Sequence, residues 1–149
     1  MFHHVAQAVS GRRLFATWEE GLRLFEIMVR AGPNPVALCL MPDHLHMAHS
    51  ADRRAAVGRA MRGHARWRNR CRSFEGSLWR RQLAVQFVPA GVKQRRLARY
   101  IHLNPCRAGL ISDPLAWPLS TYRDALGFSL RPARSAAQDP ERLHALCGP

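Results

Sequence analysis

The sequence predicts a single domain of the α+β class, with an antiparallel sheet and helices on one of its faces. The 149 residues are 47% hydrophobic, which supports one proper core but not two ordinary domains. Along the chain, apolar patterns follow the order strand, helix, strand, strand, helix, strand, and one further helix comes after them. This is the order of a split β-α-β, ferredoxin-like domain, the layout also used by RNA-recognition modules.

The first half of the chain supplies the first four of these elements. Residues Phe2 to Val9 mix apolar side chains with histidines, as expected of a first strand. Thr17 can cap a helix that runs from Trp18 to about Arg30. The apolar run Val36 to Met41 is typical of a buried strand, and Asp43 to Ser50 should be its neighbour or its continuation across Pro42.

The second half completes the pattern. Asp52 can cap a helix from Arg53 to about Arg72, with apolar residues, His64 and Cys71 on one face and most of its arginines elsewhere. Ser77 to Val88 alternates loosely and predicts the last strand. A basic helix that Pro105 ends is the addition to the ferredoxin-like core. We expect the domain to cover residues 1–127, followed by a basic, proline-containing tail over residues 128–149.

The charge of the chain points to a polyanionic partner. There are 23 Lys and Arg residues against 10 Asp and Glu, a net charge of +13, and Lys93 is the one lysine among them. Arginine adds bidentate phosphate contacts and stacking on bases, so nucleic acid is the leading partner. An anionic membrane surface or a ribosomal contact would favour a similar charge, and charge alone does not separate these partners.

Cysteine usage and hydropathy narrow the class of protein. The four cysteines are scattered without a C-x-x-C pair, which excludes a zinc ribbon and a redox motif of that kind. No apolar run reaches the ~20 residues that span a bilayer. We therefore expect a cytoplasmic protein with reduced thiols and no membrane partner.

The most informative stretch is Met41 to His46, which places two histidines one residue apart. On a strand, side chains at i and i+2 lie on the same face, so His44 and His46 can hold one cation while Leu45 points into the core. The alternative is a pair of ordinary strand histidines.

A second signal lies in the last helix. At helical spacing Tyr100 and Asn104 are i and i+4, which places a phenol and an amide oxygen on one face. Two imidazoles and an amide oxygen leave positions open for phosphate oxygens and water, which suits Mg²⁺ or Mn²⁺ as a Lewis acid. Tyr100 would then attack the phosphodiester and store its energy in a phosphotyrosine bond. A packed tyrosine and a helix-capping Asn104 are the alternatives.

With these motifs in view, the chain resembles the single-tyrosine HUH transposases, in particular the branch of REP-associated tyrosine transposases. The residues that carry the resemblance are Met41 to His46 and Tyr100 to Ile111. Three shorter stretches also fit: His4-Val5, Gly76 to Trp79, and Trp117 to Tyr122. The resemblance spans about residues 2–127.

The resemblance implies an enzyme that nicks single-stranded DNA beside a hairpin, keeps the 5′ phosphate on a tyrosine and rejoins it to another 3′ hydroxyl. By motif position, His44 and His46 are metal ligands, Asn104 is the third ligand and Tyr100 is the nucleophile. The family works as a monomer or a homodimer. The chain departs from it at Asp43, where asparagine is common, and after the first strand, where an Arg-Gly pair is common.

The DNA contacts are expected from basic side chains near the first strand, on the second helix, beside Trp79 and around the tyrosine helix. Trp79 or Trp67 can stack on an unpaired base or pack in the core. The candidates are Arg12, Arg13, Arg53, Arg54, Arg62, Arg66, Arg80, Arg81, Lys93, Arg95, Arg96 and Arg99.

Two rival functions stay open from the sequence. The first is a ferredoxin-like module that binds DNA or RNA without cutting it, in which the histidines are structural. The second is a zinc hydrolase that uses His44, His46 and Asp43. Adjacent residues of a strand project to opposite faces, so we expect Asp43 and His44 to point apart, which argues against the hydrolase.

Overall fold

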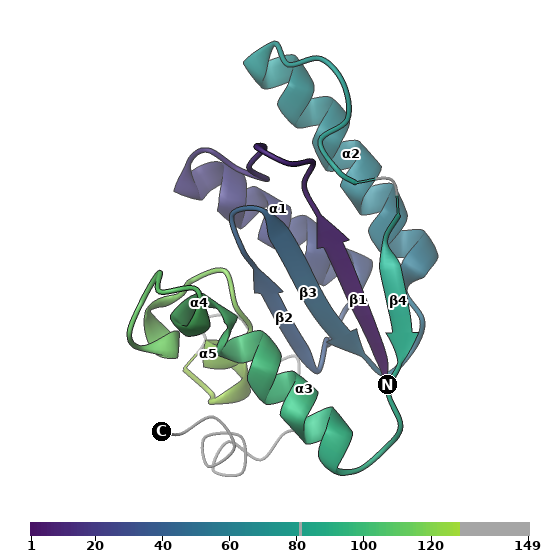
Figure 1. Cartoon of the computed structure of the whole chain (residues 1–149), viewed down its shortest axis with the longest axis vertical. Helices are drawn as coiled ribbons and strands as arrows, with labels where there is room; N and C mark the ends of the chain where they lie inside the picture. Colours follow the sequence, from purple (N-terminus) through teal and green to yellow (C-terminus); the bar gives the residue numbers. More distant parts are fainter. Residues whose placement is uncertain (81, 129–149) are drawn as a thin grey trace.

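A computed structural model, which describes residues 1–80 and 82–128, contains one antiparallel sheet with the strand order β2-β3-β1-β4 (Figure 1). The strands are β1 (Phe2–Gln7), β2 (Ala37–Leu40), β3 (His44–His49) and β4 (Ala84–Phe87). β1 pairs with both β3 and β4, and β2 forms a hairpin with β3. The order and directions confirm the predicted ferredoxin-like α+β class.

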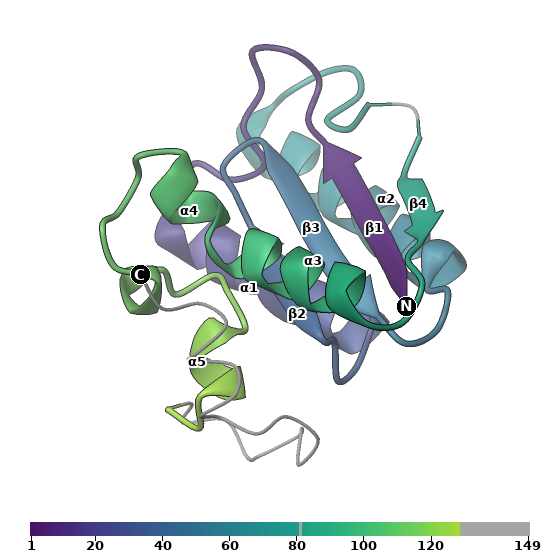
Figure 2. The same ribbon diagram turned by 60° about the horizontal axis from the view of Figure 1, so that its bottom comes forward.

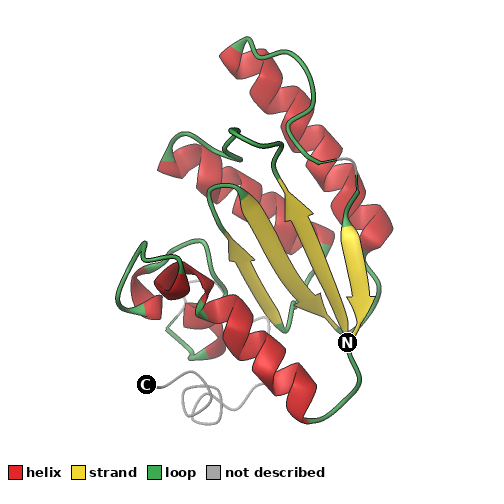
Figure 3. Cartoon of the chain, viewed as in Figure 1, coloured by secondary structure: helices red, strands yellow, loops and turns green. Residues whose placement is uncertain are grey.

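The helices lie on both faces of this sheet. Helices α1 (Trp18–Ala31) and α2 (Arg54–Arg72) cover one face, and α3 (Val92–His102) crosses the other over β2 and β3 (Figures 1 and 2). Three short elements follow, α4 (Asn104–Arg107), the 3-10 turn η1 (Pro114–Ala116) and α5 (Tyr122–Ala125) (Figure 3). None of the helices in the described ranges is both long enough and apolar enough to cross a membrane.

Helix α1 begins as its sequence predicts, and α2 begins at Arg54, one residue later than predicted, so that Asp52 precedes the N-cap residue Arg53. The Thr17 hydroxyl accepts a hydrogen bond from the backbone N–H of Glu20, at 3.3 Å. At the start of α2, the carboxylate of Asp52 accepts one from the backbone N–H of Arg54, at 2.8 Å. Each side chain thereby satisfies a backbone N–H that the first turn of a helix leaves without a partner.

The buried face of α2 differs from the prediction near its C-terminal end. Val57, Met61 and His64 are buried as expected, but Cys71 is exposed and Arg68 is buried instead. Arg68 fits inside because its guanidinium lies 3.8 Å from the carboxylate of Glu20 and 5.3 Å from the ring centre of Phe74. A charged partner and an aromatic face together offset the cost of burying an arginine.

Glu20 joins α1 to α2 and gives the first stability prediction. Its buried carboxylate accepts hydrogen bonds at 2.7 Å from the Ala16 backbone and from Arg72. Burial alone would raise the pKa of Glu20, but the Ala16 hydrogen bond and the contacts with Arg72 and Arg68 outweigh it, so the pKa lies below the ordinary value. The ionised carboxylate therefore stabilises the fold above pH ~4.5, and this contribution is lost as pH falls through the lowered pKa.

We expect Glu20→Gln to lower the free energy of unfolding by about 3 kcal/mol at pH 7, because it leaves the Arg68 charge buried without its partner. The loss should shrink as the pH falls from ~4.5 through the lowered pKa of Glu20, because the wild-type carboxylate becomes protonated over that range. Urea unfolding at a series of pH values measures both effects. Glu26→Gln is the matched control, since Glu26 lies on the same helix in an exposed pair with Arg30. Equal losses in the two variants would contradict the account.

The last strand is shorter than predicted. Of the expected range Ser77 to Val88, β4 (Ala84–Phe87) is regular strand, and Trp79 makes one isolated bridge with Ala8. The reason is that residues before β4 turn toward α2: Leu78 and Trp79 are buried, and the indole N–H of Trp79 donates to the Met61 carbonyl at 3.0 Å. These hydrogen bonds compete with a continuous strand.

The segment from Trp117 to Thr121 closes the outer edge of β2. The indole N–H of Trp117 donates to the Leu40 carbonyl, and the backbone N–H of Leu40 donates to the Leu119 carbonyl. The hydroxyl of Thr121 accepts from the Leu38 N–H at 2.9 Å. An exposed strand edge invites pairing with another chain, so this segment protects the sheet.

Candidate active site

Three aromatic rings meet between β3 and α3. His44 and His46 lie opposite Gln7 and Val5 of β1, and Leu45 between them is fully buried. The two imidazoles project to the same face of the sheet, with ring centres 5.0 Å apart and planes at 80°. The prediction that both histidines share one face is confirmed.

Tyr100 reaches this pair from α3. Its ring meets the His46 ring edge to face, at 5.3 Å between centres and 76° between planes. The guanidinium of Arg107 lies 5.4 Å from the centre of the Tyr100 ring. The side chain remains 37% exposed, so the phenol is fixed against a histidine and still accessible to a large substrate.

The helix that carries Tyr100 is interrupted before Asn104. We expected Tyr100 and Asn104 at i and i+4 of one helix, but α3 ends at His102, and Asn104 begins α4. Pro105 explains the break, because it has no backbone N–H to donate to the carbonyl of Ile101. Asn104 is buried, and its amide Nδ2 has no hydrogen-bond partner among the described residues. Its role as third metal ligand stays a prediction.

The electrostatics leave His46 neutral. Burial, reinforced by the neighbouring His44 and His3, lowers the pKa of His46 to about 3. The pKa of His3 is also lowered, by burial and then by His4. A neutral imidazole carries a lone pair on one ring nitrogen, and this is the form that binds metal ions.

In both site histidines the Nδ1 atom is occupied. His44 Nδ1 lies 2.7 Å from the carboxylate of Asp43, and His46 Nδ1 lies 3.0 Å from Nε2 of His3. Nε2 is the ring nitrogen that these contacts leave in each histidine, and a hydrogen-bonded Nδ1 is the usual arrangement behind metal-binding histidines.

The position of Asp43 corrects the sequence argument. We expected it to point away from His44, but β3 begins at His44, so Asp43 belongs to the preceding turn and its side chain is free to reach the imidazole. The carboxylate contacts Nδ1 of His44. In that position it would fix the orientation of the ring when Nε2 binds a metal.

The side chains of His44, His46 and Asn104 are the candidate ligands for a cation. No group of three or more His, Cys, Asp or Glu side chains that could hold a metal occurs in the described part of the chain. Two imidazole nitrogens with an amide oxygen would instead hold a divalent cation such as Mg²⁺ or Mn²⁺ incompletely, with positions left for phosphate oxygens. The amide nitrogen of Asn104 is buried without a hydrogen-bond partner among the described residues, and a half-turn about the last side-chain bond would put the amide oxygen in its place, as this set requires.

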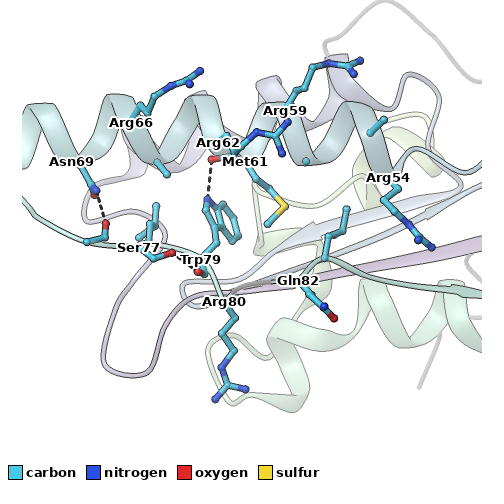
Figure 4. Close-up of a pocket in the computed structure, with 16 residues that line it drawn as sticks. Arg54, Arg59, Met61, Arg62, Arg66, Asn69, Ser77, Trp79, Arg80 and Gln82 are labelled. Atoms are coloured by element: carbon cyan, nitrogen blue, oxygen red, sulfur yellow. Dashed lines mark hydrogen bonds between the residues drawn. The ribbon is translucent and has the colours of Figure 1, made fainter.

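A basic groove lies on the other side of the molecule from α3. It encloses about 1000 Å³ between α2 and the segment before β4 (Figure 4). No carboxylate occurs among the described residues that line it. Sequence reasoning missed Arg59, although its spacing from Arg62 and Arg66 places the three on one helical face. The arginines of the groove are Arg54, Arg59, Arg62, Arg66 and Arg80.

Trp79 and Arg80, in the segment that lines this groove opposite α2, point in opposite directions (Figure 4). Trp79 packs against α2 and is 6% exposed, which favours the core alternative over the stacking of a base on its ring. Arg80 points away from α2, and its guanidinium donates to the side chain of Gln7 at 3.3 Å. Because Gln7 pairs with His44, Arg80 links the groove to the histidine face of the sheet.

A solved structure of a REP-associated tyrosine transposase bound to a REP hairpin matches the chain with a TM-score of 0.63. The match covers 93% of this chain and 85% of that one, at 19% sequence identity. This likeness shows the fold. No protein-family model and no curated protein matches the chain.

The remaining predicted DNA contacts differ in their surroundings. Arg12 is held by the Glu75 carbonyl at 2.6 Å, and Arg53 by His49 at 3.4 Å. Trp67 is covered by Arg23, whose guanidinium lies 4.4 Å from the ring centre. Arg81 and most of the predicted tail lie outside the described residues. The exposed candidates are Arg13, Lys93, Arg95, Arg96 and Arg99.

Proposed function

We propose that this protein is a metal-dependent DNA endonuclease and transposase that cleaves single-stranded DNA near a hairpin and rejoins it through a 5′-phosphotyrosine intermediate. The observation that carries the proposal is the contact between the accessible Tyr100 and the histidine pair on β3. A purely structural tyrosine has no need of a pair of imidazoles whose Nδ1 atoms are both engaged and whose Nε2 atoms are left for a ligand.

The reaction divides into two balanced transfers. The Tyr100 oxygen attacks phosphorus and gives up its proton, the bond from phosphorus to the 3′ oxygen breaks, and that oxygen takes up a proton as it leaves. In the second transfer a 3′ hydroxyl attacks the phosphotyrosine, which releases Tyr100 and restores a phosphodiester. Neither transfer consumes a nucleotide cofactor, because the phosphotyrosine conserves the bond energy.

Each residue of the site has a role in this scheme. His44, His46 and Asn104 would hold the divalent cation, which when bound polarises the phosphate and neutralises developing charge. Contact with His46 orients the Tyr100 ring, and the Arg107 guanidinium over that ring adds positive charge near the phosphate. Arg80, which reaches toward the histidine face, is placed to contact the DNA strand as it leaves the groove.

The groove supports hairpin DNA as the substrate. Its arginines and its lack of carboxylates favour a phosphate backbone, and a row of arginines along one helix suits the regular phosphates of a stem. The structure similar in fold holds a REP hairpin. We propose that the groove takes the stem and that the strand beside it passes to Tyr100.

An end-labelled hairpin oligonucleotide from the DNA that flanks the gene tests this function. Incubation with the protein and Mn²⁺ should give a covalent protein adduct on a denaturing gel, and a chelator should prevent it. Tight, salt-sensitive binding of flanking hairpins without any adduct would favour a binding module that does not cut DNA.

The groove gives a prediction for binding. The double variant Arg62→Ala, Arg66→Ala should weaken hairpin binding and make the slope of log K against log salt shallower by about 2, since two phosphate contacts are lost. Arg30→Ala on α1 is the matched control, because Arg30 is exposed and pairs with Glu26 outside the groove. Fluorescence anisotropy at several salt concentrations measures the slopes. An unchanged slope in the double variant would place the DNA elsewhere.

A further inference from the structure

A third histidine touches the site without any role in the function proposed above. His3 lies on β1 two residues before Val5, the partner of His46 in the sheet, so it projects to the same face as His46. Its Nε2 lies 3.0 Å from Nδ1 of His46. The two rings also stack, with centres 5.2 Å apart and planes at 22°.

This hydrogen bond determines which nitrogen of His46 carries the proton. A neutral imidazole has one N–H and one lone pair, so a bond between two imidazoles needs one as donor and the other as acceptor. When His46 Nδ1–H donates to His3, the lone pair of His46 is on Nε2. In the reverse arrangement His46 carries its proton on Nε2 and cannot bind a cation there.

His3 is not available as a further metal ligand through the same atom. Its Nε2 is engaged with His46, and no three-histidine group able to hold a metal occurs within the described ranges. Packing alone also does not account for His3, because its ring both hydrogen-bonds with His46 and stacks on it.

The neighbouring His44 offers an independent parallel. The carboxylate of Asp43 has no proton to give, so at 2.7 Å it requires that His44 Nδ1 be the donor. In its neutral form, which is the form that binds a metal, His44 therefore presents its lone pair on Nε2. The same tautomer in His46 would give the pair two equivalent ligand atoms.

We propose that His3 is a positioning residue that accepts a hydrogen bond from His46 Nδ1 and so holds the His46 ring and its Nε2 lone pair ready for a divalent cation. The inference rests on the proposed function for its purpose, but the hydrogen bond and the tautomer can be tested without DNA. His3 acts here through His46 and does not touch the reacting atoms.

Two substitutions separate this role from simple packing. His3→Phe keeps a flat ring to stack on His46 but removes the acceptor, and His3→Gln replaces the acceptor with an amide oxygen of similar reach. If His3→Phe lowers the unfolding temperature too far for use, His3→Leu removes the acceptor with a smaller side chain.

The first readout is ¹⁵N NMR of the His46 imidazole in the metal-free protein. We expect the Nδ1–H tautomer in the wild type and in His3→Gln, and a shift toward the Nε2–H tautomer in His3→Phe. The proposal is overturned if wild-type His46 carries its proton on Nε2, or if His3→Phe leaves the tautomer unchanged.

The second readout is the affinity for Mn²⁺, followed by electron paramagnetic resonance of the free ion. We expect His3→Phe to weaken binding about 10- to 100-fold and His3→Gln to restore most of it, as for other residues behind metal-bound histidines. Equal Mn²⁺ affinity in all three proteins would overturn the role in metal binding. If no hairpin gives an adduct, the proposed function fails while the tautomer still decides the assignment of His3.

Discussion

Tyr100→Phe should abolish formation of the covalent DNA adduct, with cleavage reduced by at least about 1000-fold, while hairpin binding stays at the wild-type level. Phenylalanine keeps the ring that meets His46 edge to face and the ring face under Arg107, so the change removes the hydroxyl and little else. The groove of α2 arginines, where we place the stem, is untouched.

Denaturing gels for the adduct and anisotropy for binding measure the two effects on the same oligonucleotide. Tyr122→Phe is the matched control, because Tyr122 is the other tyrosine of the chain and is buried in α5 with 2% exposure. The yield of adduct from Tyr122→Phe, corrected for the fraction of the protein that is folded, should equal the wild-type yield. Cleavage that survives Tyr100→Phe would exclude attack by this tyrosine.

His46→Ala should lower both the affinity for Mn²⁺ and the rate of cleavage, each by about 100-fold or more. The imidazole supplies one of only two nitrogen donors in the predicted ligand set, and its ring also supports Tyr100. His44→Ala should have a similar effect on Mn²⁺ binding, with less disturbance of the tyrosine.

His49→Gln provides the control for this experiment. His49 is on β3 as well, three residues beyond His46 and therefore on the opposite face of the sheet, where its ring hydrogen-bonds with the Pro33 carbonyl. We expect Mn²⁺ affinity and the cleavage rate at saturating DNA to be unchanged in the folded protein. Wild-type cleavage by His46→Ala at the same Mn²⁺ concentration would contradict a metal role for His46.

The parts of the site that the sequence predicts are those set by local periodicity. His44 and His46 share a face because strand side chains alternate, whatever the rest of the fold does. The contact of Tyr100 with His46 depends on α3 crossing β3, which no local pattern encodes. The sequence predicts only that Tyr100 acts in the same site as the histidines.

Three features of the site were missed or misplaced, and one of them depends on pairing between distant segments. His3 joins the site only through the register of β1 against β3, which places Val5 opposite His46, and no local pattern encodes that register. Asp43 was misplaced because strand alternation was extended one residue into a turn. The break before Asn104 was foreseeable, since Pro105 cannot donate to the preceding turn of the helix.

The same distinction holds for the fold. The order of strands and helices and the starts of α1 and α2 follow from periodicity and capping residues. The short β4 and the burial of Arg68 do not, because each depends on a tertiary partner: α2 for Trp79, and Glu20 of α1 for Arg68.

The central claim is that one particular tyrosine becomes bonded to DNA, and mass spectrometry of the adduct tests it most directly. Trypsin cuts after Arg99, Arg107 and Arg123, so the two tyrosines fall in separate peptides, 100–107 and 108–123. After reaction with hairpin DNA and Mn²⁺, nuclease trimming and digestion, we expect a nucleotide on peptide 100–107 alone. A nucleotide on peptide 108–123, or strand cleavage with neither peptide modified, would contradict it.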